Sequence, residues 1–538
     1  SLLGQADPPG RLFRLSKKGQ RAVGSRETAR STLCPRTDDS ILAATTDFPG
    51  PYWSGNPQTV RMLNAYHFVY RDSGFSFRPN HQDLVFFEWL GATNRLEAYL
   101  KWKTANILAR AVGSHDLVSC PFDLDRIPAL FDYYLQPQHL GLLRTDNGFH
   151  RMKLARRGCR RYARFAQSLY QAKAASLPAP DWKIEREIAD TVDRLSLPKC
   201  LSPKGVAVED TIITPGIVWD AINRTLAEVV PCERGTTFAA RELRASPRVP
   251  SRGACVSGPR SGGGSLGYFF KEYCGEARSS LGFDHLWGFL VSQYRIVEIR
   301  VRSDPSILED SWRISRRAAL ECERVDCVPV GLPEPFKVRV ITKGHMPSYA
   351  LARDWQPTLW RAVKNHPTFR LIGGPVTRMD VQSLFNEQDP GEETLLISGD
   401  YKQATDHIPS EVGNYILERL CDRLGVPPEH QRSLLRSLTS HNMISPSTHP
   451  EPVPQRSGQL MGSPVSFPVL CLYNAALTRV AVEISEPGRY STLEEMPMLV
   501  NGDDLLLVGK NSTYQNWKKI VKWGGLLPSV GKTLVSAK

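Results

Sequence analysis

The sequence Met-Pro-Met-Leu-Val-Asn-Gly-Asp-Asp-Leu-Leu-Leu-Val-Gly, residues 496–509, places a Gly-Asp-Asp between two apolar runs. The apolar runs predict strands and the polar centre predicts their turn, so we expect a β-hairpin. Asn501-Gly502 favours the positive φ of a tight bend. Asp503 and Asp504 then lie at the tip, and paired carboxylates on rigid strands suit hard divalent cations such as Mg²⁺. An ordinary acidic tip, kept polar for solvation, is the alternative.

The bulk composition points to a globular protein that binds polyanions. The chain has 538 residues, which predicts about three domains, and 41% of them are hydrophobic. Its net charge of +13 favours nucleic acid as a partner, although a basic protein that binds nothing charged has the same balance. No apolar run approaches the roughly 18 residues of a transmembrane segment. The chain starts at Ser1 without a signal peptide, so we expect a fragment or a processed product.

The 11 cysteines are odd in number and contain no Cys-x-x-Cys pair, which predicts reduced thiols in an intracellular protein. The segment 151–165 is rich in arginine. Lys153, Arg157, Arg160, Arg161 and Arg164 share one side of a predicted helix and could follow a phosphate backbone. A solvated amphipathic helix explains the same pattern equally well.

Two further basic segments follow. Residues 247–267 have the composition of a loop, with Arg252 and Arg260 among glycines that allow a ligand to approach the backbone. Composition alone favours a flexible linker there. Residues 335–343 alternate as a strand, which places Lys337, Arg339 and Lys343 on one face. Three cations on one face predict a bound anion, with a solvated strand face as the alternative.

The C-terminal part contains a second carboxylate segment. Residues 395–400 form a short buried strand that ends in Asp400, and Asp406 follows just before a helix predicted from about Ser410 to Leu424. Either aspartate could join Asp503 at a metal, or could simply cap a turn.

Residues 426–456 are rich in Pro, Ser and His and have the character of an insertion. The loop Ser457-Gly458-Gln459-Leu460-Met461-Gly462-Ser463-Pro464 then leads into a helix predicted from about Ser466 to Ile484. Such a loop can present N–H and hydroxyl groups to a sugar or phosphate, or it can be a plain helix entry. After the hairpin, Ser512 and Gln515 suggest a capping box, and Gly531-Lys532-Thr533 leads into a last strand.

The order of these segments resembles that of viral RNA-dependent RNA polymerases, and in particular the ourmiavirus-like (botourmiavirus) group of the narnavirus–levivirus lineage. Residues 337–343 resemble motif F, Asp400 to Asp406 resembles motif A, and residues 458–468 resemble motif B. Residues 501–504 resemble motif C, residues 531–533 resemble motif D, and the loop 250–264 looks like motif G. The resemblance covers about 250–538 well, and residues 1–240 match by position alone.

The resemblance implies an α+β right-hand fold with fingers and palm, in which an antiparallel palm sheet carries helices on one face. It implies the following domains: 1–45, a poorly ordered basic N-terminus; 46–240, a helical N-terminal region and fingers; 241–394, fingers; and 395–538, palm, with 425–456 as a fingers insertion. Motif E and a thumb would follow motif D in the family, so we expect either that the sequence is incomplete or that the thumb is absent. Gly462 and Ser466 also stand where many polymerases of other lineages carry Thr and Asn.

The resemblance further implies roles for individual residues. Asp400, Asp503 and Asp504 would hold two Mg²⁺ (or Mn²⁺) ions, and Lys532 would protonate the pyrophosphate. The nucleotide-binding residues would be Lys337, Arg339, Lys343, Asp406, Ser457, Gly458 and Ser463, of which Asp406 with Ser457 and Ser463 would read the ribose hydroxyls. The RNA-binding residues would be Arg157, Arg161, Arg252 and Arg260.

The function implied is synthesis of viral RNA from ribonucleoside triphosphates on an RNA template, by two-metal nucleotidyl transfer that releases pyrophosphate. The resemblance suggests a positive-strand RNA virus of fungi or plants that replicates in the host cytoplasm. A non-catalytic RNA-binding replication scaffold, or a truncated inactive polymerase, is the main alternative, and a two-metal nuclease is another. A reverse transcriptase is disfavoured, because Gly502 precedes Asp503 where an aromatic residue is usual and because Asp406 is polar.

Overall fold

The computed structural model describes residues 55–537, apart from 115–116, 137–138, 145–147, 232–247, 249, 275–290, 293–294, 297–304 and 387–393. The expected poorly ordered segment 1–45 lies outside the described residues. The described chain is a mixed α+β structure, and two separate hydrophobic cores divide most of its buried side chains.

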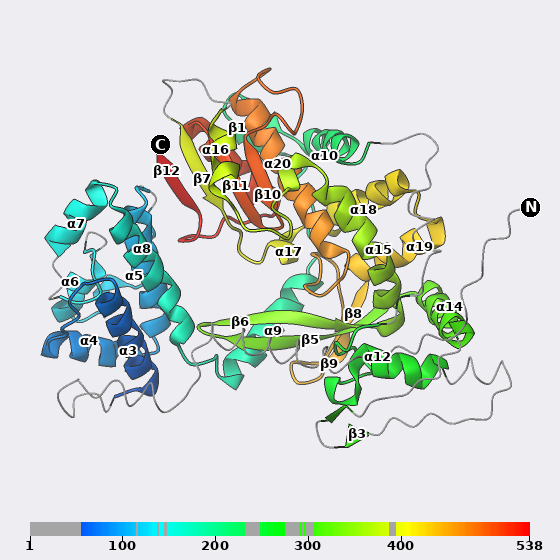
Figure 1. Ribbon diagram of the computed structural model, residues 1–538, viewed down its shortest axis with the longest axis horizontal. Coiled ribbons are helices and arrows are strands. Elements are labelled where there is room, and N and C mark those ends of the chain that lie inside the picture. Colours follow the sequence, from blue (N-terminus) through cyan, green and yellow to red (C-terminus); the bar gives the residue numbers. More distant parts are fainter. Residues whose placement is uncertain are drawn as a thin grey trace, which may run out of the picture.

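A four-stranded antiparallel sheet lies near the C-terminus (Figure 1). Its strands, in spatial order, are β10 (Met498–Asn501), β11 (Asp504–Gly509), β7 (Leu395–Gly399) and β12 (Leu534–Ala537). The predicted hairpin is therefore confirmed, but Asn501 pairs with Asp504, so the two-residue turn is Gly502-Asp503 and not Asn501-Gly502. Only Gly502 of the two has a positive φ, at 69°, which glycine adopts without a steric penalty.

Successive side chains of a β-strand point to opposite faces of the sheet, so alternate residues here join different cores. One helical layer is formed by α20 (Ser466–Ser485) and α21 (Asn511–Trp523), which pack against β10 and β11. The strand residues that join this main core are Met498, Val500, Leu505 and Leu507, with Ile397 of β7 and Val535 of β12. The opposite face is not bare, because Leu499 and Val508 form a small cluster with Leu384 of α16 (Arg378–Asn386).

Further helices enclose the main core. They are α10 (Pro215–Val229), α15 (Met346–Lys364), α17 (Ala404–His407), α18 (Ser410–Leu424) and α19 (Pro428–Thr439). The predicted span of α18 is confirmed, although Pro409 and not Ser410 is its N-cap, and Gly425 ends the helix with a φ of 65°.

The predicted helix after residue 466 is confirmed as α20. Of the helices in the described ranges, α20 is the one long and apolar enough to cross a membrane. However, 83% of that apolar window is buried inside the protein, as in a core helix. The capping box predicted from Ser512 and Gln515 is wrong, since α21 begins one residue earlier and the Lys510 N–H bonds to Thr513 Oγ1 at 3.3 Å.

A second four-stranded sheet has the order β6 (Lys337–Gly344), β5 (Val325–Glu334), β8 (His441–Ser445) and β9 (His449–Pro454). β5 and β6 form a long antiparallel hairpin, and β8 pairs with β5 in parallel. The segment expected as an insertion therefore supplies one helix and two strands of regular structure. Helix α9 (Asp181–Ser196) crosses β5 at Gly331, where a Cβ atom would lie 2.4 Å from Ile184 Cγ2.

A helical region at the N-terminal side has its own aromatic-rich core. Its helices are α3 (Pro57–Asp72), α4 (His81–Ala92), α5 (Leu96–Ala111), α6 (Asp132–Leu135), α7 (Gly148–Arg156) and α8 (Arg160–Gln171). Asn56 caps α3, and Asn80 with Asp83 forms a capping box on α4.

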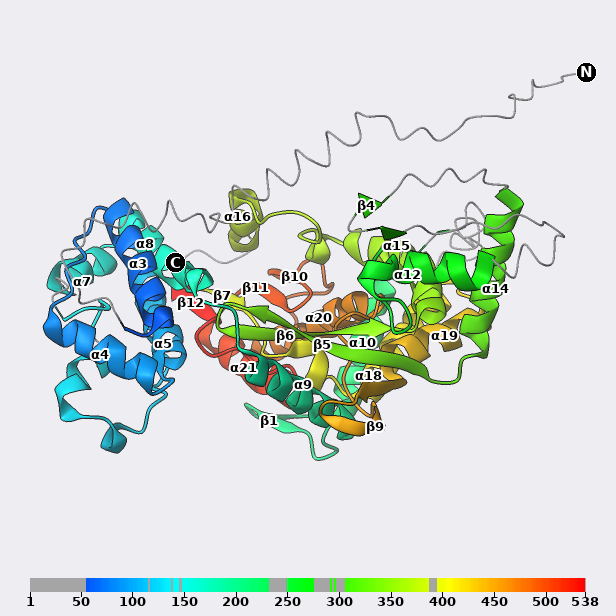
Figure 2. The same cartoon turned by 90° about the horizontal axis from the view of Figure 1, so that it is seen from below.

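The helical region docks on two distant segments, which Figures 1 and 2 show beside it. Phe336, between β5 and β6, is buried in its core, and Leu534 of β12 packs against that core. Ser536 Oγ donates to the Val112 carbonyl at 2.8 Å. The remaining elements are β1 (Val206–Val208), β2 (Thr211–Ile213), α12 (Gly264–Phe269), β3 (Val291–Ser292), β4 (Arg295–Ile296) and α14 (Pro305–Glu321).

Candidate active site

The backbone brings three aspartates together where β7 ends and β11 begins. In the antiparallel ladder Gly399 lies opposite Leu505, so the next position places Asp400 opposite Asp504. Residues directly opposite each other in such a ladder are about 4.5–5.5 Å apart at Cα. Asp503 occupies the adjoining turn. The predicted convergence of Asp400, Asp503 and Asp504 is therefore present in the backbone geometry.

Helix α20 holds this turn in place through one of its faces. The Gly502 N–H donates to Cys471 Sγ at 3.2 Å, and Asn474 Nδ2 donates to the Gly502 carbonyl at 3.0 Å. A Cβ atom at Gly502 would lie 2.8 Å from the Phe467 ring. Asn474 Oδ1 also accepts from the Tyr401 hydroxyl at 2.7 Å. One buried amide thus ties the residue after Asp400 to the turn that carries Asp503.

The carboxylates perturb one another electrostatically. Loss of solvent raises the pKa of Asp503, and the Asp400 carboxylate raises it further. The pKa of Asp504 is raised by loss of solvent and then by Asp503 and Asp400. Like charges held this close oppose ionisation, so the cluster favours a compensating cation.

Two lysines partly supply that charge. Lys532 Nζ lies 3.2 Å from Asp400 Oδ2 as an ion pair. Lys337 is close enough that Lys532 and Asp400 both influence it, and its pKa is lowered by partial loss of solvent around an otherwise exposed side chain, by Arg339 and by Lys532. Ammonium groups that crowd in this way favour an anion beside them.

The donor set fits a magnesium ion that also binds substrate. Asp400 Oδ2 is buried and accepts no hydrogen bond from the described part of the chain. Within the same residues, no three His, Cys, Asp or Glu side chains are placed to hold a metal ion by themselves. Mg²⁺ usually takes only one or two carboxylates and completes its shell with water and substrate phosphates. Asp400 Oδ2, whose partner is the Lys532 ammonium group, lies beside two further carboxylates and satisfies that requirement.

Comparison with known proteins bears on this geometry. The chain is 33% identical over 460 residues to a protein described as the RNA-dependent RNA polymerase of Ourmia melon virus, an alignment that covers 82% of this chain and 50% of the relative. The chain is a homologue of a viral RNA-dependent RNA polymerase. It spans about half the length of that relative. No protein-family model matches the chain.

In this polymerase homologue the cationic strand β6 shows the predicted alternation only over its first three residues, since residues 340–343 are all half-buried. Lys337 and Arg339 are exposed and Val338 is buried, while Lys343 is half-buried. Arg339 Nε lies 3.2 Å from Glu334 Oε1 across the hairpin, so part of the predicted charge excess is compensated within the protein. Lys337 and Lys343 therefore provide most of the charge on this face.

The far end of β6 contacts the glycine loop that follows Ser457. The Thr342 N–H donates to the Met461 carbonyl at 2.9 Å. Gly462 has a φ of 138°, and a Cβ atom there would lie 2.5 Å from the Thr342 carbonyl oxygen. Glycine at 462, where other lineages carry a side chain, is thus explained by close backbone approach.

The loop that contains Arg252 and Arg260 is more ordered than a flexible linker. The Ser265 N–H donates to the Gly253 carbonyl at 2.7 Å, and the Val256 N–H donates to the Gly344 carbonyl at 3.2 Å. Both arginines are exposed. A small pocket lies between this loop, the end of β6, α15 and Gly462; it is lined by Ser251, Cys255, Thr342, Tyr349 and Arg353, among others.

The predicted nucleotide-binding residues of the glycine loop form hydrogen bonds within the protein, and Asp406 differs from them. Ser457 is fully buried and its hydroxyl donates to the Arg194 carbonyl at 3.4 Å, while Ser463 Oγ donates to the Ser437 carbonyl at 2.6 Å. Gly458 packs against α17, and its N–H donates to the Ile408 carbonyl at 2.9 Å. Asp406 alone of the set presents an ionisable group, and Arg194 pairs with it.

The predicted basic helix at 151–165 is wrong in one respect, because the chain breaks at Gly158, where φ is 59°, into α7 and α8. Arg157 lies at this break and is exposed. Arg161 donates from Nε to the Ser73 carbonyl at 3.1 Å and from Nη2 at 2.9 Å, so it joins α8 to the end of α3.

Sequence reasoning missed Arg194, Cys471 and Asn474. The last two follow Phe467 at spacings of four and seven residues, which place all three on one face of a helix. That spacing could have identified Cys471 and Asn474 from the sequence. Arg194 lies more than 200 residues before its partner and carries no local signal.

Proposed function

We propose that this chain catalyses template-directed synthesis of RNA from ribonucleoside triphosphates, with release of pyrophosphate. The observation that carries the proposal is the convergence of Asp400, Asp503 and Asp504 at the ends of β7 and β11, with Lys532 against Asp400. A non-catalytic RNA-binding protein has no need to hold three mutually repelling carboxylates together.

Asp400 and Asp503 would hold two Mg²⁺ or Mn²⁺ ions, with Asp504 assisting. When bound, such ions stabilise the charge on the triphosphate and lower the pKa of the attacking hydroxyl. Lys337, Arg339 and Lys343 would neutralise the incoming triphosphate. Lys532 would donate a proton to the leaving pyrophosphate.

The same proposal assigns parts of the fold. The sheet β10-β11-β7-β12 with α20 and α21 would be the palm, and the sheet β6-β5-β8-β9 with the loop at 250–264 would belong to the fingers. Exposed Arg252, Arg260 and Arg157 would contact RNA. The predicted site of action is the host cytoplasm, with RNA template, RNA product and ribonucleoside triphosphates as partners.

The test is RNA synthesis by the purified protein. It is supplied with single-stranded RNA, four ribonucleotides and Mg²⁺ or Mn²⁺, beside Asp503→Ala and the exposed control Asp210→Ala. We expect template-length product from the wild type and from Asp210→Ala, and at least a 100-fold loss in Asp503→Ala. Metal-dependent RNA retention with no product from any variant would support the scaffold alternative instead.

A further inference from the structure

The carboxylate of Asp406 is held by an arginine from outside the polymerase motifs. Arg194, near the end of α9, donates to Asp406 Oδ2 from Nε at 3.1 Å and from Nη2 at 2.9 Å. The side chains of both residues are largely buried, with 18% of Arg194 and 13% of Asp406 exposed. A buried pair with two hydrogen bonds has a much better defined geometry than a surface ion pair.

The pair lies at a junction of three segments. The Arg456 and Ser457 N–H groups donate to the Leu195 carbonyl at 2.8 and 3.1 Å, so α9 is fixed to the start of the glycine loop. Lys199 Nζ donates to the Asp406 carbonyl at 2.8 Å. The end of α9 therefore positions both the backbone and the side chain of Asp406.

The junction also requires glycine at position 458. A Cβ atom there would lie 2.6 Å from Leu195 Cδ2 and 2.8 Å from the Asp406 carbonyl oxygen. Gly458 has a φ of 70°, a conformation that side chains disfavour. The close approach of α9, α17 and this loop thus depends on Gly458, independently of any ligand contact by that residue.

Arg194 leaves one carboxylate oxygen with spare acceptor capacity. Both guanidinium hydrogen bonds go to Oδ2, whereas Oδ1 accepts from Thr405 Oγ1 at 3.2 Å. An ionised carboxylate has about four acceptor positions and no donor. Burial raises the pKa of Asp406, and Arg194 opposes that rise. The arginine therefore favours a form that can only accept a hydrogen bond, as a sugar hydroxyl requires.

The nearby hydroxyl groups are neutral and therefore weaker acceptors than an ionised carboxylate. Ser457 and Ser463 donate to backbone carbonyls, and Ser466 Oγ donates to Gln459 Oε1 at 2.9 Å. Their orientations are thus set by the protein.

We infer that Arg194 is a positioning residue that orients Asp406 to accept the 2′-hydroxyl of an incoming ribonucleotide, and so sets the preference for ribonucleotides over deoxyribonucleotides. This inference rests on the proposed function and extends it, because it places a determinant of sugar selection in the N-terminal half of the chain.

The test measures incorporation of one nucleotide opposite a template uridine, with ATP and 2′-deoxy-ATP as alternative substrates. The ratio of their kcat/KM values is compared for the wild type, Arg194→Gln, Arg194→Lys and the control Arg186→Gln, which changes an exposed arginine on the same helix. We expect Arg194→Gln to lower the ratio by about tenfold or more, mainly through a higher KM for ATP. The substitution removes the charge-assisted hydrogen bonds that orient Asp406, so Asp406 binds the 2′-hydroxyl of ATP less well. Arg194→Lys should restore part of the ratio, and Arg186→Gln should match the wild type.

Three results would decide against the inference. If Arg194→Gln lowers kcat/KM equally for both nucleotides, Arg194 has a structural role only. If the ratio is unchanged and synthesis is efficient, the inference is wrong while the proposed function stands. If Arg194→Gln does not fold, Arg194→Lys decides by the same ratio. A wild type that incorporates neither nucleotide removes the proposed function and this inference together, so the two failures are distinguishable.

Discussion

At the scale of single residues, the buried polar groups of this protein serve to connect chain segments. His441 is fully buried, with Nδ1 2.7 Å from Gln455 Oε1 and Nε2 3.2 Å from the Tyr349 hydroxyl. The amide oxygen can only accept, so Nδ1 carries the proton and Nε2 accepts from Tyr349. Gln455 Nε2 in turn donates to the Gly458 carbonyl at 2.9 Å. The neutral imidazole therefore links α15 to the glycine loop.

Acid should weaken this link. Burial lowers the pKa of His441 to about 4, whereas the unfolded chain takes up the proton near its ordinary value of 6.5. The unfolded state binds more protons between these values, so the free energy of unfolding should fall as the pH drops from about 6.5 to 4, by up to about 3 kcal/mol from this residue.

Urea denaturation of the wild type and His441→Asn across that pH range measures the effect. The variant should be less stable at pH 7 and should have a shallower pH dependence. Parallel curves for the two proteins would contradict the assignment. His139 and His407, whose pKa values are lowered by burial to about 3 and about 4, add to the slope in both proteins.

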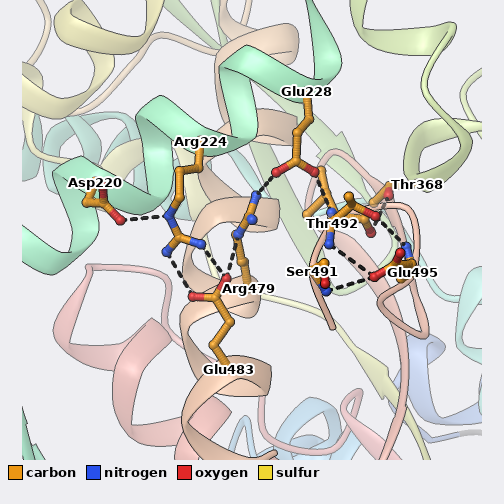
Figure 3. A network of polar contacts seen from close by, with 10 residues as sticks. Asp220, Arg224, Glu228, Thr368, Arg479, Glu483, Ser491, Thr492 and Glu495 are labelled. Atoms are coloured by element: carbon orange, nitrogen blue, oxygen red, sulfur yellow. Dashed lines mark hydrogen bonds and ion pairs between the residues drawn. The ribbon is translucent and has the colours of Figure 1, made fainter. Parts of the chain in front are cut away.

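At the scale of elements, a chain of ion pairs fixes α10 to α20 (Figure 3). Arg479 is 2% exposed and lies 2.7 Å from Glu228 Oε1 and 2.8 Å from Glu483 Oε1. Arg224 Nη2 donates to Glu483 Oε2 at 2.9 Å. Glu228 also accepts from the Leu493 N–H, five residues before β10. The network therefore fixes the helix that clamps the Gly502 turn and the segment that leads into β10.

Replacing Arg479 by Met should leave two carboxylates without their shared partner. We expect the free energy of unfolding to fall by about 3 kcal/mol, the low end for a buried pair because both glutamates retain some contact with solvent. Urea denaturation measures this loss. Arg419→Met, at an exposed pair on α18, should change stability by less than about 0.5 kcal/mol. Equal effects of the two substitutions would show that the network is no more than a surface feature.

The elements also show what the sequence can predict. The Gly-Asp-Asp hairpin, the span of α18 and the start of α20 follow from local periodicity and turn chemistry, and all three are confirmed. The helix break at Gly158 and the start of α21 were mispredicted, because the competing local signals differ by little in free energy.

The partners of the candidate site were least predictable. Asp400 and Asp503 were found because each lies at a strand end. In contrast, the Arg194–Asp406 pair and the electrostatic influence of Lys337 on Asp503 depend on how distant segments pack. Such tertiary contacts leave no periodic trace in one sequence.

At the scale of the whole molecule, the net charge of +13 should dominate nucleic-acid binding. Lys153, Arg156, Arg157, Arg160 and Arg164 are exposed on α7, α8 and the turn between them. Phosphate contacts by such residues release counterions, so RNA affinity should fall steeply with salt.

Arg157 and Arg161 should respond differently to substitution. Arg157→Gln should weaken RNA binding at low salt and reduce the slope of log affinity against log salt by about 1, without altering thermal unfolding. Arg161→Gln should lower the unfolding temperature, because it removes hydrogen bonds to the Ser73 carbonyl. Fluorescence anisotropy with labelled RNA and a thermal melt of each variant separate the two roles. An unchanged salt slope in Arg157→Gln would exclude that residue from the RNA interface.

The docking of the helical region on β12 has a consequence for synthesis on the ribosome. The helices of residues 57–171 emerge several hundred residues before the strand at 534–537 that packs beside their core, a delay on the order of tens of seconds. β7 likewise cannot pair until its neighbours β11 and β12 have been synthesised. Asp400 therefore meets Asp503 and Asp504 only after β11 has left the exit tunnel. A nascent chain that has not yet released β11 therefore lacks the paired carboxylates on which the proposed activity depends.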